Sequence, residues 1–219
     1  SEILVNCVRA GEIIDARQIQ PGWDRLDFDD AAWRTVKMIA PPAGKPVSQD
    51  QPPIRVTQSV HPVAITEPKP NVYIVDMGIN MTGWVQLKVK GRPGQMLSLH
   101  YNEQLDPDGT LMNSNRQFTY GPFQRDIFLC SGGEDVFEPR FTYHGYRYVE
   151  IKGMDEKPSP DTIVGRFVHT DPEPVGTFAC SNDLINQEHD ICLRTVHCNI
   201  HSIPTDCPHR EKLGWMQDG

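Results

Sequence analysis

The sequence lacks a long apolar run and lacks clusters of basic residues. No uninterrupted apolar stretch of its 219 residues approaches the ~20 that a membrane-spanning helix needs. We therefore expect a soluble protein without a membrane partner. Because the formal net charge is -8 and no Lys/Arg cluster offsets it, nucleic acid is excluded as an expected partner, and a neutral or cationic ligand fits better.

Several signature motifs are also missing. The sequence contains no G-x-G-x-x-G, Walker, H-E-x-x-H or G-x-S-x-G motif, so nucleotide, zinc-protease and hydrolase-triad functions lose their main support and no cofactor is expected. It contains no C-x-x-C pair, and its six cysteines favour free, mostly buried thiols over disulfides. The chain begins without methionine or a signal-peptide pattern, so any targeting segment would lie upstream and the compartment stays open.

What the sequence does contain, from about residue 53 to 171, is a series of strand signals. Stretches such as "NVYIVDMG", "GWVQLKVKG" and "RYVEIKG" alternate or run apolar for the length of a strand, and "GRPGQ" and "DPDGT" supply turn residues between them. A hairpin turn explains "DPDGT" better than a calcium loop, because the closing acid of an EF-hand is missing. The pattern predicts a mainly β protein built on an antiparallel β-sandwich.

The two ends differ from this middle part. Residues 1–52 hold few strand candidates and look like the C-terminal part of an N-terminal β module, whereas residues 53–174 form the sandwich. In residues 175–219, "NDLINQEHDICLRTVHCNI" has apolar spacings of three and four, which predicts one amphipathic helix capped by Ser181 or Asn182. A lone helix cannot bury its apolar face, so we expect partner helices after Gly219 and a chain that ends within a domain.

Chemically dense residues close the chain in "PTDCPHREKLGWMQDG". If a helix begins near His209, then Glu211, Trp215 and Asp218 share one face, where carboxylates could bind sugar hydroxyls and the indole could pack on a sugar ring. The alternative is structural: Asp206 caps a helix, Glu211 and Lys212 are solvated and Trp215 lies in the core. The spacing alone leaves both interpretations open.

Two further patterns have functional and structural interpretations. Cys198, His201, Cys207 and His209 could bind zinc, although their spacing matches no familiar zinc finger and histidines on a helix face are the simpler explanation. An aromatic sugar groove is the second possibility, opposed by the more common role of alternating aromatics as core residues; its candidates are Trp84, Tyr143, His144, Tyr146 and Tyr148. Gly145, within that strand, is expected to mark a bulge.

Several stretches together resemble one known family. They are "VYIVDMGINMTGWVQLKVKG", "LHYNEQLDPDGTL", "EPRFTYHGYRYVEIKG", "VHTDPEPVGTFACSNDLIN" and "SIPTDCPHREKLGWMQD". In this order they resemble landmarks of the bacterial α-L-rhamnosidases of glycoside hydrolase family 78. The resemblance implies a β-sandwich followed by the first helix or helices of an (α/α)6 toroid, and thus an internal fragment that ends early in the catalytic domain.

The resemblance also implies roles for the C-terminal residues. Glu211 would be the general acid of an inverting hydrolysis of terminal α-L-rhamnose from a rhamnose-containing glycoside. Asp206, Arg210, Trp215 and Asp218 would shape the rhamnose subsite, with Trp215 against the apolar side of the sugar. No metal ligand is implied.

The sequence departs from the family pattern in ways that matter for activity. His209 stands where many members have glutamine, and "MQD" replaces the more usual "TGD". The catalytic base of the family is a glutamate beyond Gly219, so we expect this chain alone to be inactive. The alternative function is that of a non-catalytic carbohydrate-binding β-sandwich.

Overall fold

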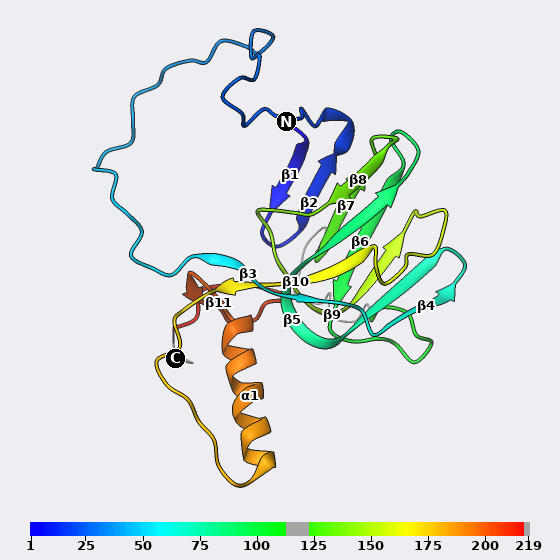
Figure 1. The fold of residues 1–219 in the computed structure, drawn as a ribbon, viewed down its shortest axis with the longest axis vertical. Coiled ribbons are helices and arrows are strands. Elements are labelled where there is room, and N and C mark those ends of the chain that lie inside the picture. The colour runs from blue at the N-terminus through cyan, green and yellow to red at the C-terminus, as the bar shows by residue number, and fades with distance from the viewer. Residues whose placement is uncertain (113–122, 217–219) are drawn as a thin grey trace.

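The described residues fold into one curled ten-stranded β-sheet, from which an α-helix projects, and a separate two-stranded sheet follows that helix (Figure 1). The structure is a computed structural model that describes residues 1–112 and 123–216. Its elements, in chain order, are β1 (Ile3–Cys7), β2 (Gly11–Asp15), a 3-10 turn (Ala16–Gln18), β3 (Ile54–Val60), β4 (Ala64–Lys69), β5 (Val72–Lys90), β6 (Met96–Asn102), β7 (Arg125–Leu129), β8 (Glu134–Phe137), β9 (His144–Lys152), β10 (Ile163–Thr170), α1 (Asp183–Cys198), β11 (Ile200–His201) and β12 (Ile203–Pro204).

The long strand β5 is central to the sheet, because it pairs with β4, β8, β9 and β10. The strands follow the order β1-β2-β7-β6-β9-β5-β10-β3, and β4 and β8 pair with the two ends of β5. The register between β5 and β9 shifts between Asp76 and Met81, where Gly78 has a φ of 75° that side chains rarely adopt. Through this irregularity one strand pairs with β4 at its start and with β8 at its end. The predicted mainly β, antiparallel architecture is confirmed, and the β2–β7 pairing departs from it by being parallel.

Alternating residues of these strands form the core. In β7 the sequence RDIFL buries every second residue, and Phe128 packs at 5.2 Å from the ring of Phe137. Tyr146 is fully buried and donates a hydrogen bond to the carbonyl of Trp84 at 2.6 Å. The aromatic strand therefore contributes core residues, as the commoner of the two interpretations predicted.

The predicted bulge at Gly145 is wrong. Gly145 pairs in regular register with Thr82, and the irregularity of this strand pair lies further along, between Asp76 and Met81. A Cβ atom at Gly145 would lie 2.8 Å from Cγ of Pro208, closer than real Cβ contacts. Glycine is needed there because the C-terminal segment packs directly on the strand.

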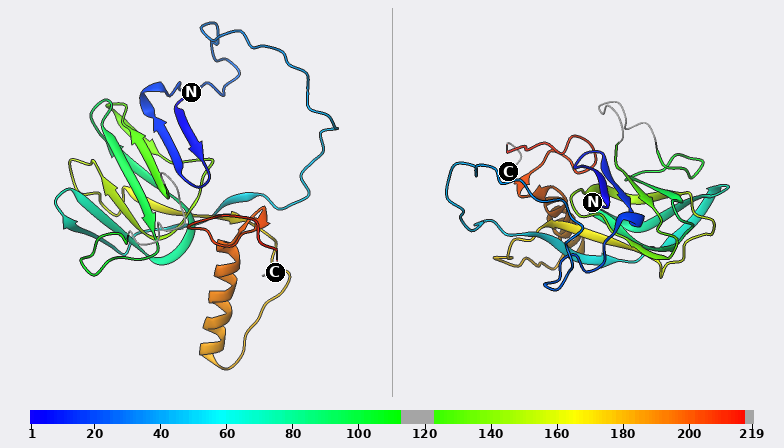
Figure 2. Two further views of the ribbon diagram at one scale, coloured as in Figure 1. Left: turned by 180° about the vertical axis from the view of Figure 1, so that it is seen from behind. Right: turned by 90° about the horizontal axis from the view of Figure 1, so that it is seen from above.

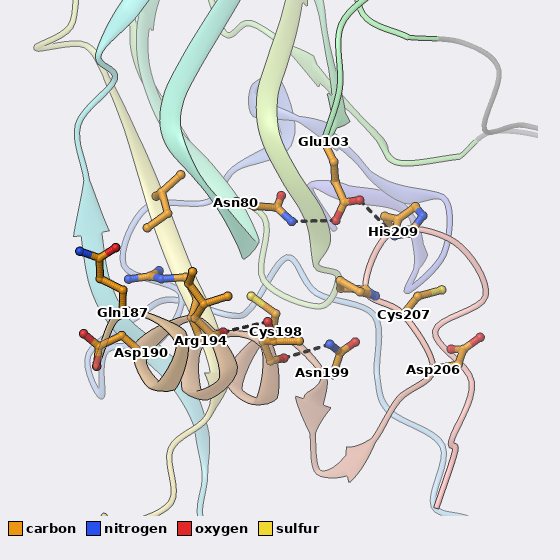
Figure 3. Close-up of a pocket in the computed structure, with 14 residues that line it drawn as sticks. Asn80, Glu103, Gln187, Asp190, Arg194, Cys198, Asn199, Asp206, Cys207 and His209 are labelled. Atoms are coloured by element: carbon orange, nitrogen blue, oxygen red, sulfur yellow. Dashed lines mark hydrogen bonds and ion pairs between the residues drawn. The ribbon is translucent and has the colours of Figure 1, made fainter. Parts of the chain in front are cut away.

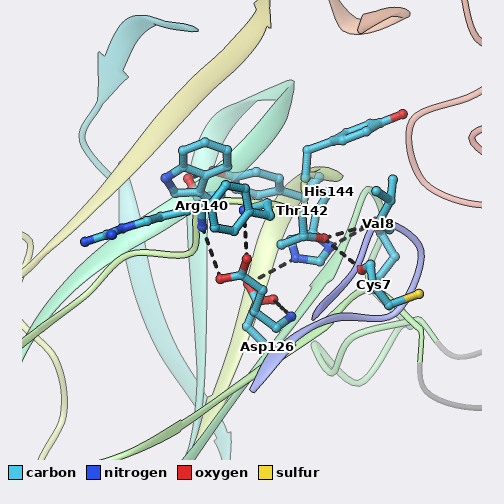
Figure 4. A network of polar contacts seen from close by, with 12 residues as sticks. Cys7, Val8, Asp126, Arg140, Thr142 and His144 are labelled. Atoms are coloured by element: carbon cyan, nitrogen blue, oxygen red, sulfur yellow. Dashed lines mark hydrogen bonds and ion pairs between the residues drawn. The ribbon is translucent and has the colours of Figure 1, made fainter. Parts of the chain in front are cut away.

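The N-terminal hairpin β1–β2 belongs to the same sheet through its parallel pairing with β7. Within it, Glu12 of β2 is fully buried and accepts hydrogen bonds from the backbone N–H groups of Arg140 (3.1 Å) and Phe141 (2.7 Å). A second contact in this network joins Thr142 to the carbonyls of Cys7 and Val8, each at 3.3 Å (Figure 4). These bonds tie the first residues of the chain to the segment that leads into β9.

Helix α1 starts where the sequence predicts. Asn182 is the cap: its side chain accepts a hydrogen bond from the N–H of Leu184 at 3.0 Å. The helix points away from the sheet (Figure 2), and its apolar side chains are solvent-exposed, Leu184 by 71% and Ile191 by 66%. Among the described residues, no helix has the length and apolar character that crossing a membrane requires.

Candidate active site

The segment that follows β12 is a loop, closed like a hairpin. Thr205 forms a β-bridge with Gly214, and the N–H of Asp206 donates to the carbonyl of Leu213 at 3.0 Å. The carboxylate of Asp206 accepts a hydrogen bond from the N–H of Leu213 at 2.8 Å. We call residues 205–215 the catalytic loop, after the role expected from the sequence, because they carry four of the five predicted site residues.

The helix from His209, on which the first interpretation depended, therefore does not form. Residues 208–211 form a turn, and Lys212 has a φ of 50°, a left-handed conformation that no helix continues. The side chain of Asp206 satisfies a backbone N–H across the loop instead of capping a helix. Glu211 and Trp215 consequently do not share a helical face.

Two further elements of the structural interpretation, those for Trp215 and Lys212, fail as well. Trp215 is 46% exposed, so it is not a core residue, whereas Lys212 is buried. Asp218, the remaining predicted subsite residue, lies outside the described residues.

Glu211 has two close neighbours in the loop. The thiol of Cys207 donates a hydrogen bond to Oε2 of Glu211 at 3.0 Å, and Nε of Arg210 lies 3.4 Å from the same oxygen. The hydrogen bond from Cys207 lowers the pKa of Glu211, although partial burial opposes the shift. Glu211 is therefore a carboxylate at neutral pH in this environment and can accept hydrogen bonds.

Possible metal ligands gather in the same loop. Within the described part of the chain, Asp206, Cys207 and Glu211 are the one group whose ligand atoms lie within 4.8 Å of one another. The four alternative zinc ligands do not meet: the ring of His201 stacks on Tyr143 at 3.7 Å, and Nδ1 of His209 lies 3.6 Å from Oε2 of Glu103. All six cysteines are free, as predicted, but the expectation that most of them are buried is wrong, because Cys7, Cys180 and Cys192 are exposed.

A cleft of about 790 Å³ separates the catalytic loop, the sheet and α1 (Figure 3). The loop lines it with Asp206, Cys207 and His209, β5 adds Asn80, and Glu103, the residue after β6, completes the polar lining on that side. Sequence reasoning missed Asn80 and Glu103; both lie in stretches that carried the family resemblance, but nothing in the sequence distinguished them there.

Asn80 and Glu103 are linked to the loop. The side-chain amide of Asn80 donates to Oε1 of Glu103 at 3.0 Å, and the other oxygen of Glu103 faces His209. Burial lowers the pKa of His209, while the charge of Glu103 acts in the opposite direction. The cleft thus presents polar groups from two parts of the fold to one space.

The alternative aromatic sugar groove does not form. Tyr143, His144 and Tyr146 are buried, and the indole N–H of Trp84 donates to a carboxylate oxygen of Glu138 at 3.1 Å. Trp84 and Tyr143 line a second cavity of about 480 Å³, but His144 and Tyr146 lie in the core and do not reach it, so the five candidates do not form one groove.

Three family models match consecutive parts of the chain. The α-L-rhamnosidase N-terminal domain matches residues 1–58, the bacterial α-L-rhamnosidase concanavalin-like domain matches residues 66–169, and the six-hairpin glycosidase domain of the same enzymes matches residues 173–219. The chain belongs to the bacterial α-L-rhamnosidase family. The resemblance seen in the sequence is thereby confirmed, and the third match corresponds to the start of the toroid.

The relatives of this chain in the α-L-rhamnosidase family are much longer than the chain itself. An α-L-rhamnosidase of Formosa agariphila is 37% identical over 219 residues, which cover 99% of this chain and 23% of the relative. One of Streptomyces avermitilis is 37% identical over 212 residues, covering 95% and 20%. The chain therefore spans about a quarter of the length of the relatives it matches.

Solved structures agree with the fold. The α-L-rhamnosidase from Dictyoglumus thermophilum has a TM-score of 0.90 and 41% identity, over 99% of this chain and 25% of that one. The S. avermitilis enzyme, in complex with L-rhamnose, has a TM-score of 0.89 and 36% identity, over 99% and 21%.

Proposed function

We propose that this chain is part of an inverting α-L-rhamnosidase that hydrolyses terminal α-L-rhamnose from glycosides. One observation carries the proposal: the catalytic loop brings the carboxylate of Glu211 together with Arg210 and with Cys207, and of these three residues Cys207 lines the cleft. Family membership supports it, as does the rhamnose complex of the S. avermitilis relative. The ligand is then a rhamnose-containing glycoside.

In the proposed reaction Glu211 is the general acid. Its carboxylic acid form gives a proton to the glycosidic oxygen as the bond from that oxygen to C1 of rhamnose breaks. A water molecule attacks C1 from the opposite face and loses its proton to a carboxylate base elsewhere in the intact enzyme. The products are β-L-rhamnose and the free aglycone alcohol.

The neighbours of Glu211 would bind the sugar. Asp206 and Asp218 would accept hydrogen bonds from hydroxyl groups, and the guanidinium of Arg210 would donate to hydroxyl oxygens. The half-exposed ring of Trp215 would pack against the apolar side of rhamnose, including its C6 methyl group.

The chain by itself should be inactive. An inverting site needs a second carboxylate roughly 6.5–9.5 Å from the acid, and in the family pattern that base follows Gly219. A general acid also needs a raised pKa, whereas the pKa of Glu211 is lowered here. In the proposed division of the protein, residues 175–219 supply the acid, residues 53–174 the sandwich and residues 1–52 part of an N-terminal module.

The decisive test uses the intact enzyme and an aryl α-L-rhamnoside. Glu211→Gln should abolish most turnover, because the amide cannot donate an acidic proton. Rhamnose binding, measured by calorimetry, should be retained. Glu188→Gln, at an exposed position of α1, is the matched control and should leave turnover unchanged. Full turnover in Glu211→Gln would overturn the assignment of the acid.

Two measurements test the remaining parts of the proposal. NMR of the first product formed should show β-L-rhamnose; the α anomer would contradict inversion. The purified 219-residue chain should not release aryl alcohol above background, and clear hydrolysis would show that it contains its own base.

A further inference from the structure

The side chain of Lys212 is buried beneath the catalytic loop. Its ammonium donates hydrogen bonds to the backbone carbonyls of Val8 at 2.8 Å and of Tyr143 at 2.6 Å, and the residue is only 9% exposed. It also lies 4.8 Å from the centre of the Tyr143 ring, within the range of a cation–π contact. The structural interpretation of the sequence had Lys212 in solvent, and neither interpretation expected this buried contact.

The two carbonyls belong to distant parts of the chain. Val8 lies between β1 and β2, and Tyr143 directly precedes β9. The carbonyl of Val8 also accepts a hydrogen bond from Thr142 (Figure 4). A single ammonium group thus joins the catalytic loop to the N-terminal hairpin and to the sheet.

The two hydrogen bonds of the Lys212 ammonium, which we call the anchor, hold an unfavourable backbone conformation at this residue. Lys212 has a φ of 50°, which costs a residue with a Cβ atom about 1 kcal/mol or more. Burying an ammonium group is a further cost, and burial lowers the pKa of Lys212 to about 7. A conformation with both costs persists when the surrounding contacts determine it, and the two carbonyls supply such contacts.

Glu211 precedes Lys212, so the anchor acts directly on the backbone of the proposed acid. On the other side, Asp206 pairs with Leu213 across the loop. The carboxylate of Glu211 is therefore carried by a short segment that is fixed at Lys212 to the sheet and at Leu213 to the opposite strand of the loop.

We propose that Lys212 is a positioning residue, whose buried ammonium fixes the catalytic loop on the sheet and thereby sets the place of the Glu211 carboxylate. The inference rests on the proposed function, in which Glu211 protonates the glycosidic oxygen. It assigns the N-terminal hairpin a part in holding the acid, because one of the two anchoring carbonyls is that of Val8.

The test compares variants of the intact enzyme on an aryl α-L-rhamnoside. Lys212→Met keeps an unbranched side chain, one atom shorter than that of lysine, but has no donor, so kcat should fall about tenfold or more, since small misplacements of a reacting group are costly. KM should change far less, because the subsite residues remain. Lys212→Arg keeps a cationic donor and should retain more of kcat, and Lys37→Met, at an exposed position, should equal the wild type.

A second measurement separates positioning from unfolding. Hydrogen exchange of the 219-residue chain should become faster at the backbone amides of Asp206 and Leu213 in Lys212→Met. The amides of Tyr146 and Val149 in the core should stay protected. If Lys212→Met does not fold, Lys212→Gln, a neutral donor of shorter reach, takes its place with the same expected loss of kcat and faster loop exchange.

The outcomes distinguish this inference from the proposed function. Wild-type kcat in the folded Lys212→Met enzyme would overturn the positioning role, as would equal losses in Lys212→Met and Lys212→Arg. If Glu211→Gln keeps full turnover, the proposed function itself fails. If Glu211→Gln loses turnover and Lys212→Met does not, only the positioning role fails.

Discussion

The thiol of Cys207 lies 3.0 Å from Oε2 of Glu211 and donates a hydrogen bond to it. A donor that binds the charged form of a carboxyl group stabilises that form, and this contact is the main reason why the pKa of Glu211 is lowered. Burial raises the pKa of the Cys207 thiol, and the hydrogen bond to Glu211 raises it further, so the proton stays on sulfur. The pair therefore keeps the carboxyl group of Glu211 deprotonated at neutral pH in this structure.

Cys207→Ala should raise the pKa of Glu211 toward its ordinary value of 4.5, because the carboxylate loses its strongest hydrogen-bond donor. The shift can be followed in the 219-residue chain by carbon-13 NMR of the Glu211 carboxyl group across a pH titration. Cys180→Ala removes an exposed thiol and is the matched control, with no expected shift. An unchanged or lower pKa in Cys207→Ala would show that another group holds the carboxylate.

His144→Phe should destabilise the fold by about 3 kcal/mol, because it removes one partner of a buried polar pair. Nε2 of His144 lies 3.0 Å from Oδ2 of Asp126, and both side chains are fully buried. Phenylalanine can keep the stacking on Tyr101, which lies at 4.1 Å between ring centres, but leaves the carboxylate without this contact. Urea unfolding measures the difference.

The control for this substitution is His61→Phe, at an exposed position, with an expected change under about 0.5 kcal/mol. A loss for His144→Phe no larger than that of the control would mean that Asp126 finds another donor or that the polar contact adds little beyond ring packing.

Stability should fall as the pH decreases from about 6.5 to about 4, in part because of His201. Burial lowers the pKa of His201 from 6.5 to about 4. Between these values the unfolded chain binds a proton that the folded chain does not, so the free energy of unfolding decreases as the pH falls. The contribution is complete above pH 6.5 and disappears as the pH approaches 4.

His201→Phe tests this contribution, because its ring can keep the stack on Tyr143 without titrating. The free energy of unfolding should then vary less steeply between pH 6.5 and 4, by at most about 1.4 kcal/mol per pH unit. Some slope remains, since burial also lowers the pKa values of His144, His197 and His209. An unchanged slope would mean that His201 is protonated alike in both states.

Much of the fold could be predicted from local sequence patterns. The alternation of apolar residues in stretches such as RDIFL is a property of single strands, and the cap of α1 depends on Asn182 and its immediate neighbours. The Asp-Gly turn also forms as expected, with Asp108 accepting a hydrogen bond from the N–H of Thr110 at 3.0 Å. These features require no knowledge of distant parts of the chain.

For the site, the sequence predicted which residues take part but not how they are arranged. The resemblance named Glu211, but the apparent helical spacing was misleading, because the backbone there is set by the contact between Asp206 and Leu213 and by the anchor of Lys212. Those contacts join residues up to 204 positions apart, and no periodicity encodes them. The same holds for Glu103, which approaches His209 only in the folded chain.

The close approach of Gly145 to Pro208 gives a last test of how the loop is held. A Cβ atom at Gly145 would lie 2.8 Å from Cγ of Pro208 and 3.0 Å from the backbone nitrogen of His209. Gly145→Ala should therefore push the start of the catalytic loop away from β9 and cost about 1–3 kcal/mol of stability in urea unfolding.

The displacement of the loop should also be detectable by hydrogen exchange and by kinetics. In Gly145→Ala, hydrogen exchange should become faster at the amides of Asp206 and Leu213, which close the loop, and the intact enzyme should lose kcat for the same reason as Lys212→Met. Gly176→Ala is the matched control, because a Cβ atom there meets nothing within 4 Å. If Gly145→Ala behaves like this control, the loop adjusts without cost and its contact with β9 does not determine where Glu211 lies.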